Sequence, residues 1–121
     1  MAGKKTLVLG ASTNPSRYSY LALNRLSAYN HPVVAIGQRE GKVGDIDIVK
    51  GQPALDEVDT VTLYLNPTNQ KPYYDYILSL KPKRIIFNPG TENYELEQLA
   101  TDKGIKSVEA CTLVMLGTGQ Y

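Results

Sequence analysis

Five short apolar runs constrain the fold of this chain more than any other feature of its sequence. They span Lys5 to Leu9, Pro32 to Ile36, Thr60 to Leu65, Arg84 to Phe87 and Ile105 to Val108. Runs of this length that are rich in β-branched residues predict β-strands. Their apolar positions follow one another almost without interruption, whereas a half-solvated strand alternates apolar and polar residues. The pattern therefore predicts parallel strands with helices covering both faces of the sheet.

Helical periodicity appears in the segments between these strands. The expected buried stripes are Tyr18, Ala22, Leu26 and Tyr29 in the first helix, Tyr73, Ile77 and Leu80 in a later one, and Leu96, Leu99 and Ala100 in the last. Strands that alternate with helices are typical of right-handed βαβ units. We therefore predict an α/β fold, a Rossmann-like three-layer sandwich with a five-stranded, mostly parallel sheet and helices on both faces. A single domain is expected to span residues 1–121.

The stretch from Gly37 to Asp59 is less regular and is interpreted as a connection. Glycines punctuate it, and it has room for a short strand at Ile46 to Val49 and one helical turn at Ala54 to Val58.

Composition excludes several classes of function. Thirteen Lys and Arg against twelve Asp and Glu give a net charge of +1, too small for nonspecific binding to nucleic acid. No apolar run is long enough to span a bilayer and no signal sequence is apparent, so a cytoplasmic protein without a membrane partner is expected. With one cysteine, Cys111, and one histidine, His31, neither a disulfide framework nor a protein-ligated transition metal is expected.

Three Asn-Pro dipeptides, at Asn14-Pro15, Asn66-Pro67 and Asn88-Pro89, each follow a predicted strand. Asn is a favoured helix N-cap and Pro suits the first helical position, so two of the three are expected to start helices. The carboxyl ends of parallel strands line one crevice, where ligands bind at the topological switch point. All three dipeptides are expected to face that crevice, although taken singly each can be only a cap or a turn.

The segment from Gly10 to Arg17 joins the first strand to the first helix, where unpaired amides and the helix dipole favour an anion. Gly10 permits a tight turn, Ser12 offers a hydroxyl and Arg17 offers a charge-assisted contact. This indicates a phosphate site, although the later glycines of the dinucleotide fingerprint are absent. A purely structural turn with a solvated arginine is the alternative.

The second strand ends in Gly37-Gln38-Arg39, where an NAD-binding domain carries an acidic residue for the ribose hydroxyl. A basic residue at this point disfavours NAD. It suits a ribose phosphate, which NADP carries at the 2′ position and coenzyme A at the 3′ position. Alternatively, Arg39 is a plain surface residue.

Residues Leu7 to Arg17, reading LVLGASTNPSR, resemble the opening loop of the small stand-alone coenzyme A-binding proteins, a family similar to the cofactor domain of the succinyl-CoA synthetase α subunit. The resemblance extends to Asn66-Pro67, Asn88-Pro89-Gly90 and Glu109-Ala110-Cys111. It implies that the diphosphate is held by Gly10, Ala11, Ser12 and Arg17. It also implies that the turn after the second strand meets the adenosine, and that the pocket wall contains Asn66, Pro67, Asn88, Pro89 and Gly90. The family usually has Asn-Pro-Lys where this chain has Gly37-Gln38-Arg39.

Candidates for catalytic chemistry are few. His31 is expected at the sheet edge opposite the crevice, and no neighbour of Cys111 in the sequence activates its thiol. The leading hypothesis is a non-catalytic module that binds coenzyme A or an acyl-CoA, as a homo-oligomer or with a separate catalytic subunit. The alternative is a small NADP-dependent or thiol-exchange enzyme that uses Cys111.

Overall fold

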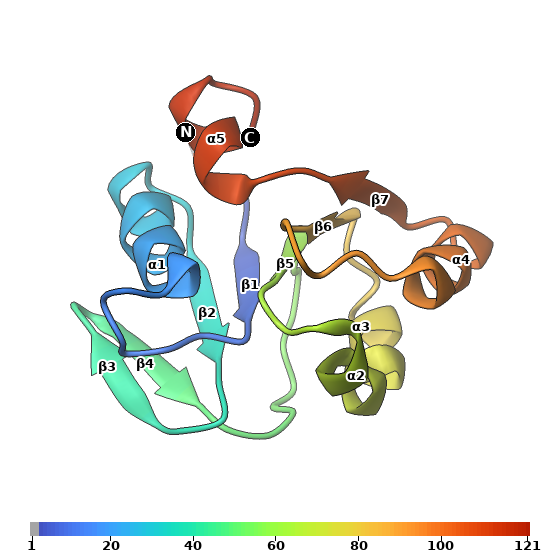
Figure 1. Ribbon diagram of the computed structural model, residues 1–121, viewed down its shortest axis with the longest axis horizontal. Helices are drawn as coiled ribbons and strands as arrows, with labels where there is room; N and C mark the ends of the chain where they lie inside the picture. The colour runs from blue at the N-terminus through green and yellow to red at the C-terminus, as the bar shows by residue number, and fades with distance from the viewer. Residues whose placement is uncertain (1–2) are drawn as a thin grey trace.

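The computed structural model describes residues 3–121. Seven strands of this chain form one mixed sheet with the order β3-β4-β2-β1-β5-β6-β7 (Figure 1). The strands are β1 (Thr6–Leu9), β2 (Val33–Ile36), β3 (Gly41–Val43), β4 (Ile46–Val49), β5 (Thr60–Leu63), β6 (Arg84–Phe87) and β7 (Lys106–Glu109). Strand β3 is antiparallel to β4, and the other neighbouring pairs are parallel. The predicted α/β architecture is confirmed, but the sheet has seven strands and not five.

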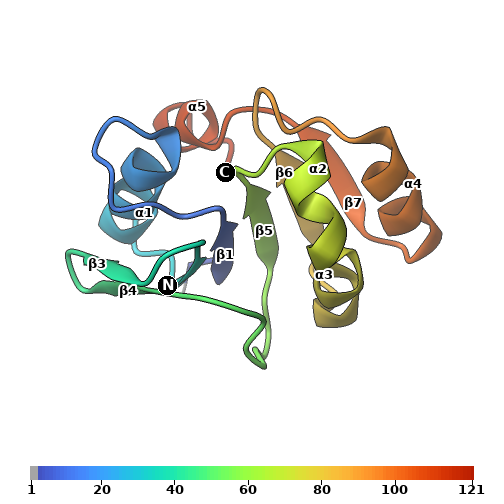
Figure 2. The same ribbon diagram turned by 60° about the horizontal axis from the view of Figure 1, so that its bottom comes forward.

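Helices cover both faces of this sheet (Figures 1 and 2). They are α1 (Tyr18–Ala28), α2 (Pro67–Gln70), the 3₁₀ turn η1 (Lys71–Tyr73), α3 (Tyr74–Leu80), α4 (Tyr94–Asp102) and α5 (Thr112–Gly117). Helices α1 and α5 pack on one face, and α3 and α4 pack on the other. The predicted three layers are therefore present.

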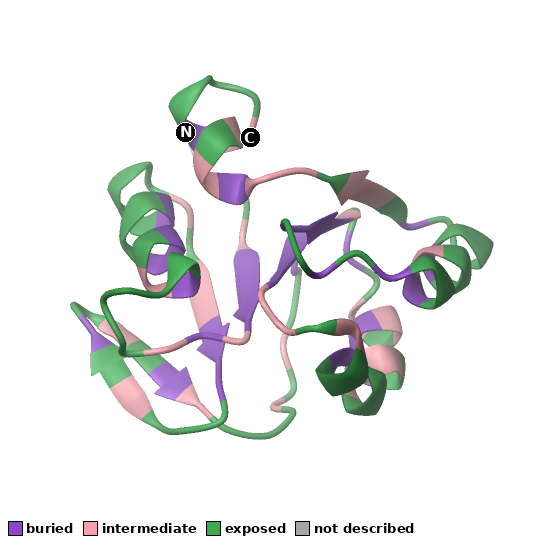
Figure 3. Cartoon of the chain, in the orientation of Figure 1, coloured by how far each residue is buried: buried purple, intermediate pink, exposed green. Residues whose placement is uncertain are grey.

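The sheet separates two apolar cores, because successive side chains of a strand point to opposite faces. In β1, Leu7 and Leu9 pack with α3 and α4, whereas Val8 packs with Leu23 and Leu26 of α1. All four residues of β1 are buried, which explains the uninterrupted apolar run (Figure 3).

The extra strands form a hairpin at one edge of the sheet. Strands β3 and β4 are joined by Gly44-Asp45, and β4 then pairs in parallel with β2. The short strand considered for Ile46 to Val49 is confirmed. The helical turn considered for Ala54 to Val58 is wrong, because that segment is irregular and only Val58 is buried in the core.

The buried face of α1 is rotated from the predicted stripe. Tyr18 is 71% exposed and Tyr29 is 49% exposed. The buried residues of the helix are Ser19, Ala22, Leu23 and Leu26. Helix α4 shows a smaller difference, because Leu96 and Ala100 are buried as predicted whereas Leu99 lies at the surface.

Tyr121 packs at the amino-terminal ends of the strands, beside the first residues of β1 and β6. Its ring lies 4.4 Å from the Arg84 guanidinium carbon and 4.7 Å from the His31 ring, and its hydroxyl pairs with Thr6 Oγ1. Partial burial and the nearby charges of Lys4 and Arg84 lower the pKa of His31. His31 also accepts a hydrogen bond from the Lys4 amide, so its role here is packing at the amino-terminal ends of the strands.

We predict that Leu26→Ala lowers the free energy of unfolding by about 2–5 kcal/mol, because it opens a cavity beneath α1. Leu21→Ala is the matched control, since Leu21 lies on the same helix but is 40% exposed. Its cost is expected within about 1 kcal/mol. Urea unfolding of both variants measures the difference, and equal losses would mean that α1 packs with another face.

Candidate functional site

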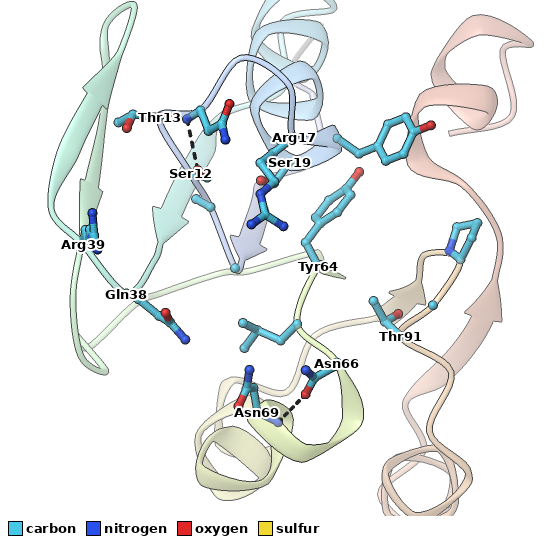
Figure 4. A pocket seen from close by; sticks show the side chains of 17 residues that line it. Ser12, Thr13, Arg17, Ser19, Gln38, Arg39, Tyr64, Asn66, Asn69 and Thr91 are labelled. Carbon is cyan, nitrogen blue, oxygen red and sulfur yellow. Dashed lines mark hydrogen bonds between the residues drawn. The ribbon is translucent and has the colours of Figure 1, made fainter.

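A cleft of about 790 Å³ crosses the carboxyl ends of the central strands (Figure 4). Strand β1 lies between β2 and β5. The chain passes from β1 to β2 on one side and later returns to β5 on the other, so the cleft lies at the topological switch point. Its lining residues are Gly10, Ala11, Ser12, Thr13, Asn14, Arg17, Tyr18, Ser19, Gln38, Arg39, Tyr64, Leu65, Asn66, Asn69, Pro89, Gly90 and Thr91.

The loop after β1 is held in shape by its own polar side chains. The Asn14 amide donates to Ser12 Oγ, and Asn14 Oδ1 accepts from both the amide and the hydroxyl of Ser16. These short-range bonds complete the loop before α1 begins at Tyr18. The shape of the loop is therefore set by hydrogen bonds within the chain.

Two amides predicted to bind phosphate are already engaged. Gly10 N and Ala11 N both donate to the Ile36 carbonyl at 2.9 Å. Four other amides in and after the loop have no such acceptor among residues 3–121. They are the amides of Ser12, Thr13, Tyr18 and Ser19. All four belong to residues that line the cleft, where a preorganised group of donors favours an anion.

The charged residues of the cleft lining are both cationic. Arg17 lies at the N-cap of α1 without a side-chain cap hydrogen bond, and Arg39 follows the end of β2; both are exposed. No aspartate or glutamate is among the residues that line the cleft. The two guanidinium groups therefore lack a carboxylate partner in the lining and favour a ligand with several negative charges.

Gly10 is required by the close approach of two strand ends. Its φ is +100°, and a Cβ at this position would lie 2.9 Å from the Tyr64 carbonyl carbon. A side chain would therefore clash with backbone at the centre of the cleft.

The three Asn-Pro dipeptides have three different roles. Asn66 is the N-cap of α2 and accepts from the Asn69 amide, whereas Asn14 closes the loop before α1. Asn88 is 2% exposed and binds Thr62, the Leu63 carbonyl and the Thr112 amide. The prediction that two dipeptides start helices is therefore wrong, since only Asn66-Pro67 does.

Most of the predicted site residues come together in this one cleft. The predicted residues that line it are Gly10, Ala11, Ser12, Asn14, Arg17, Gln38, Arg39, Asn66, Pro89 and Gly90. The structure does not bring Pro15, Pro67 or Asn88 into the lining. Gly37 instead lines an adjoining cavity of about 270 Å³, together with Gly51, Gln52, Pro72 and Tyr73.

Tyr64 is the most distinctive lining residue that sequence reasoning missed. Its ring extends along the cleft near the start of α1 (Figure 4), and its hydroxyl is buried without a hydrogen-bond partner in the described chain. Burial raises the pKa of this hydroxyl, an effect that the neighbouring Thr112 and Thr62 hydroxyls only partly offset. The residue was hidden in the apolar run Thr60 to Leu65, where tyrosine is an ordinary strand residue.

The residues considered for chemistry lie outside the cleft lining. Cys111 is half-buried at the N-cap of α5, and His31 packs at the opposite end of the sheet. In the part of the chain that the structure describes, no group of three histidine, cysteine or carboxylate side chains is arranged to hold a metal ion. The described helices also include none with the length and apolar character needed to cross a bilayer.

Comparison with known proteins identifies the family of the chain. Residues 4–117 match the family model described as the CoA binding domain. An uncharacterized protein with a known crystal structure is 52% identical in sequence. The match covers 100% of both chains, with a TM-score of 0.96. A search of curated proteins gave no significant match.

Two more distant structures share the fold. A hypothetical protein from Pyrococcus horikoshii is 20% identical, with a TM-score of 0.86 over 96% of this chain and 83% of that one. A Thermus thermophilus protein is also 20% identical, with a TM-score of 0.84 over 98% of this chain and 91% of that one. At this level of identity, the likeness shows the fold alone.

We predict that Gly10→Ala destabilises the protein more than Gly44→Ala does. Both glycines have positive φ, but a Cβ at Gly44 meets nothing within 4 Å. The Gly44 variant should lose about 1–2 kcal/mol from backbone conformation alone. The Gly10 variant adds a clash with Tyr64, so equal unfolding free energies in urea would contradict the close approach of β1 and β5.

Proposed function

We propose that this chain, which belongs to the CoA binding domain family, binds coenzyme A across the tips of β1 and β5 with its diphosphate at the loop from Ser12 to Ser19. The observation that carries the proposal is the set of four unpaired amides beside two arginines, in a cleft lining without carboxylates. Backbone amides and guanidinium groups are the usual ligands of phosphate oxygens in proteins.

The adenosine is assigned to the side of the cleft nearest β2. The adjoining cavity offers glycine backbone from Gly37 and Gly51, together with the partly buried side chains of Leu65 and Tyr73. Flat apolar and aromatic walls of this kind suit a purine ring. Arg39, at the end of β2, is assigned to the ribose 3′-phosphate.

The opposite side of the cleft is assigned to the pantetheine arm. Its lining is polar but uncharged, with Asn66, Asn69 and Thr91 beside Pro89 and Gly90. Pantetheine carries two amide groups and no charge, so amide and hydroxyl side chains are suitable partners.

The module is proposed to be non-catalytic on its own, with any chemistry at the thiol supplied by a second copy or a separate catalytic subunit. The cleft lining supports this because it contains two arginines and tyrosines but no histidine, cysteine or carboxylate. An NADP-binding role is the second candidate, since Arg39 suits a 2′-phosphate as well as a 3′-phosphate.

A thermal-shift comparison of coenzyme A, dephospho-coenzyme A, NADP and NAD tests the ligand. At 100 times its dissociation constant, a ligand stabilises the folded state by about 2.7 kcal/mol, a shift of several degrees for a domain of this size. We expect coenzyme A to give the largest shift, and dephospho-coenzyme A a smaller one because it lacks the phosphate assigned to Arg39. A shift with NADP and none with coenzyme A would reject the proposal in favour of the second candidate.

We predict that Arg17→Ala weakens coenzyme A binding by roughly 10- to 100-fold, because it removes a charge-assisted hydrogen bond to phosphate. Arg25→Ala is the matched control, since Arg25 is exposed on the same helix but outside the cleft lining. Isothermal titration calorimetry of both variants measures the change. Unchanged affinity in Arg17→Ala would remove this residue from the phosphate site.

A further inference from the structure

Gln70 joins two loops that form different parts of the cleft. Its side chain is fully buried, and Nε2 donates to the Leu65 and Thr91 carbonyls at 2.8 Å each. Leu65 follows β5 and Thr91 follows β6, and both residues line the cleft. One amide group therefore ties together the ends of two neighbouring strands.

The remaining oxygen of this amide is also bonded. Gln70 Oε1 accepts from Asn93 Nδ2 at 2.8 Å, and Asn93 uses its own Oδ1 to cap α4 by accepting from the Leu96 amide. Buried amides with all these partners hold a single orientation, because each lost bond leaves a desolvated polar group. Gln70 thus has little freedom to move, and neither do the two loops.

The loop after β6 is itself a rigid turn. The Asn88 carbonyl accepts from the Thr91 amide at 2.9 Å, and between them Pro89 is followed by Gly90 with φ +92°. Pro at the second position and a positive-φ Gly at the third define a type II turn. The Asn88 side chain bonds the first residue of this turn to the Leu63 carbonyl of β5, and Gln70 bonds the last residue through the Thr91 carbonyl.

We propose that Gln70 is a positioning residue that sets the cleft wall for the pantetheine arm of coenzyme A without touching the ligand. This inference rests on the proposed function. Leu65 lines both the cleft and the adjoining cavity assigned to the adenosine, whereas the turn Pro89-Gly90-Thr91 lines the cleft alone and lies on the side away from Arg39 (Figure 4). Gln70 therefore affects affinity for the arm selectively.

The test compares two ligands on the same protein: coenzyme A, and adenosine 3′-phosphate 5′-diphosphate, which keeps the adenosine and all three phosphates but lacks the arm. In the unaltered protein, coenzyme A is expected to bind more tightly. Gln70→Met keeps a similar side-chain length but cannot bond the carbonyls of Leu65 and Thr91. It is expected to weaken coenzyme A binding by roughly tenfold, as for one misplaced hydrogen bond, and to weaken binding of adenosine 3′-phosphate 5′-diphosphate by less than about twofold.

Two further variants separate positioning from general destabilisation. Ile77→Val removes one methyl group from the core beside α3, so it lowers stability while leaving both affinities unchanged. Asn93→Ser keeps an N-cap oxygen for α4, but its shorter side chain does not extend to Gln70 Oε1 as Asn93 Nδ2 does, so it should reproduce a weaker form of the Gln70→Met result. This variant carries the test if Gln70→Met does not fold.

The outcomes distinguish the inference from the function beneath it. If the unaltered protein binds neither ligand, the proposed function fails. If it binds coenzyme A, and Gln70→Met and Asn93→Ser weaken both ligands equally or neither of them, the function stands and the positioning role is overturned. Equal affinities of the unaltered protein for the two ligands would also overturn the positioning role, because the cleft wall would then contribute nothing to binding of the pantetheine arm.

Discussion

The double hydrogen bond from Gly10 N and Ala11 N to the Ile36 carbonyl is the interaction on which the rest of the cleft depends. It continues the pairing of β1 with β2 past the end of the regular strand, and so fixes where the chain turns away from the sheet. Of the amides that follow, those of Asn14, Ser16 and Arg17 are bonded within the loop, whereas those of Ser12, Thr13, Tyr18 and Ser19 have no acceptor among residues 3–121. A loop that is both rigid and rich in free donors results directly from this junction.

The strands of the central sheet could be predicted from the sequence because burial on both faces leaves a local signal. Leu7, Val8 and Leu9 are all buried, so no polar residue interrupts the run. Strand β3 and its pairing with β4 were missed because both strands are short and mostly half-exposed. The Gly44-Asp45 pair that joins them is a known two-residue turn signal, and it was the one cue available.

In the candidate site, too, the parts held by local bonds could be predicted and the parts held by distant residues could not. The loop from Gly10 to Arg17 could be predicted because its residues are neighbours in the chain and its bonds are local. The role of Gln70 could not be predicted, since two of its partners, Thr91 and Asn93, are brought to it by the pairing of β5 with β6. Asn88 shows the limit most clearly, because an Asn-Pro pair also follows β5 at Asn66. Asn88 is buried at the end of β6 and bonds to β5 and α5, whereas Asn66 caps α2.

The two edge strands, β3 and β7, determine whether the sheet can pair with strands of other molecules. At one edge β3 has only three residues and carries an exposed lysine, Lys42; at the other, β7 exposes Lys106 and Glu109. Short edges with charged side chains discourage pairing with strands of other molecules. Association through the sheet edges is therefore disfavoured, and the well-exposed apolar side chains lie on the helices, as at Tyr18 of α1 and Val114 of α5.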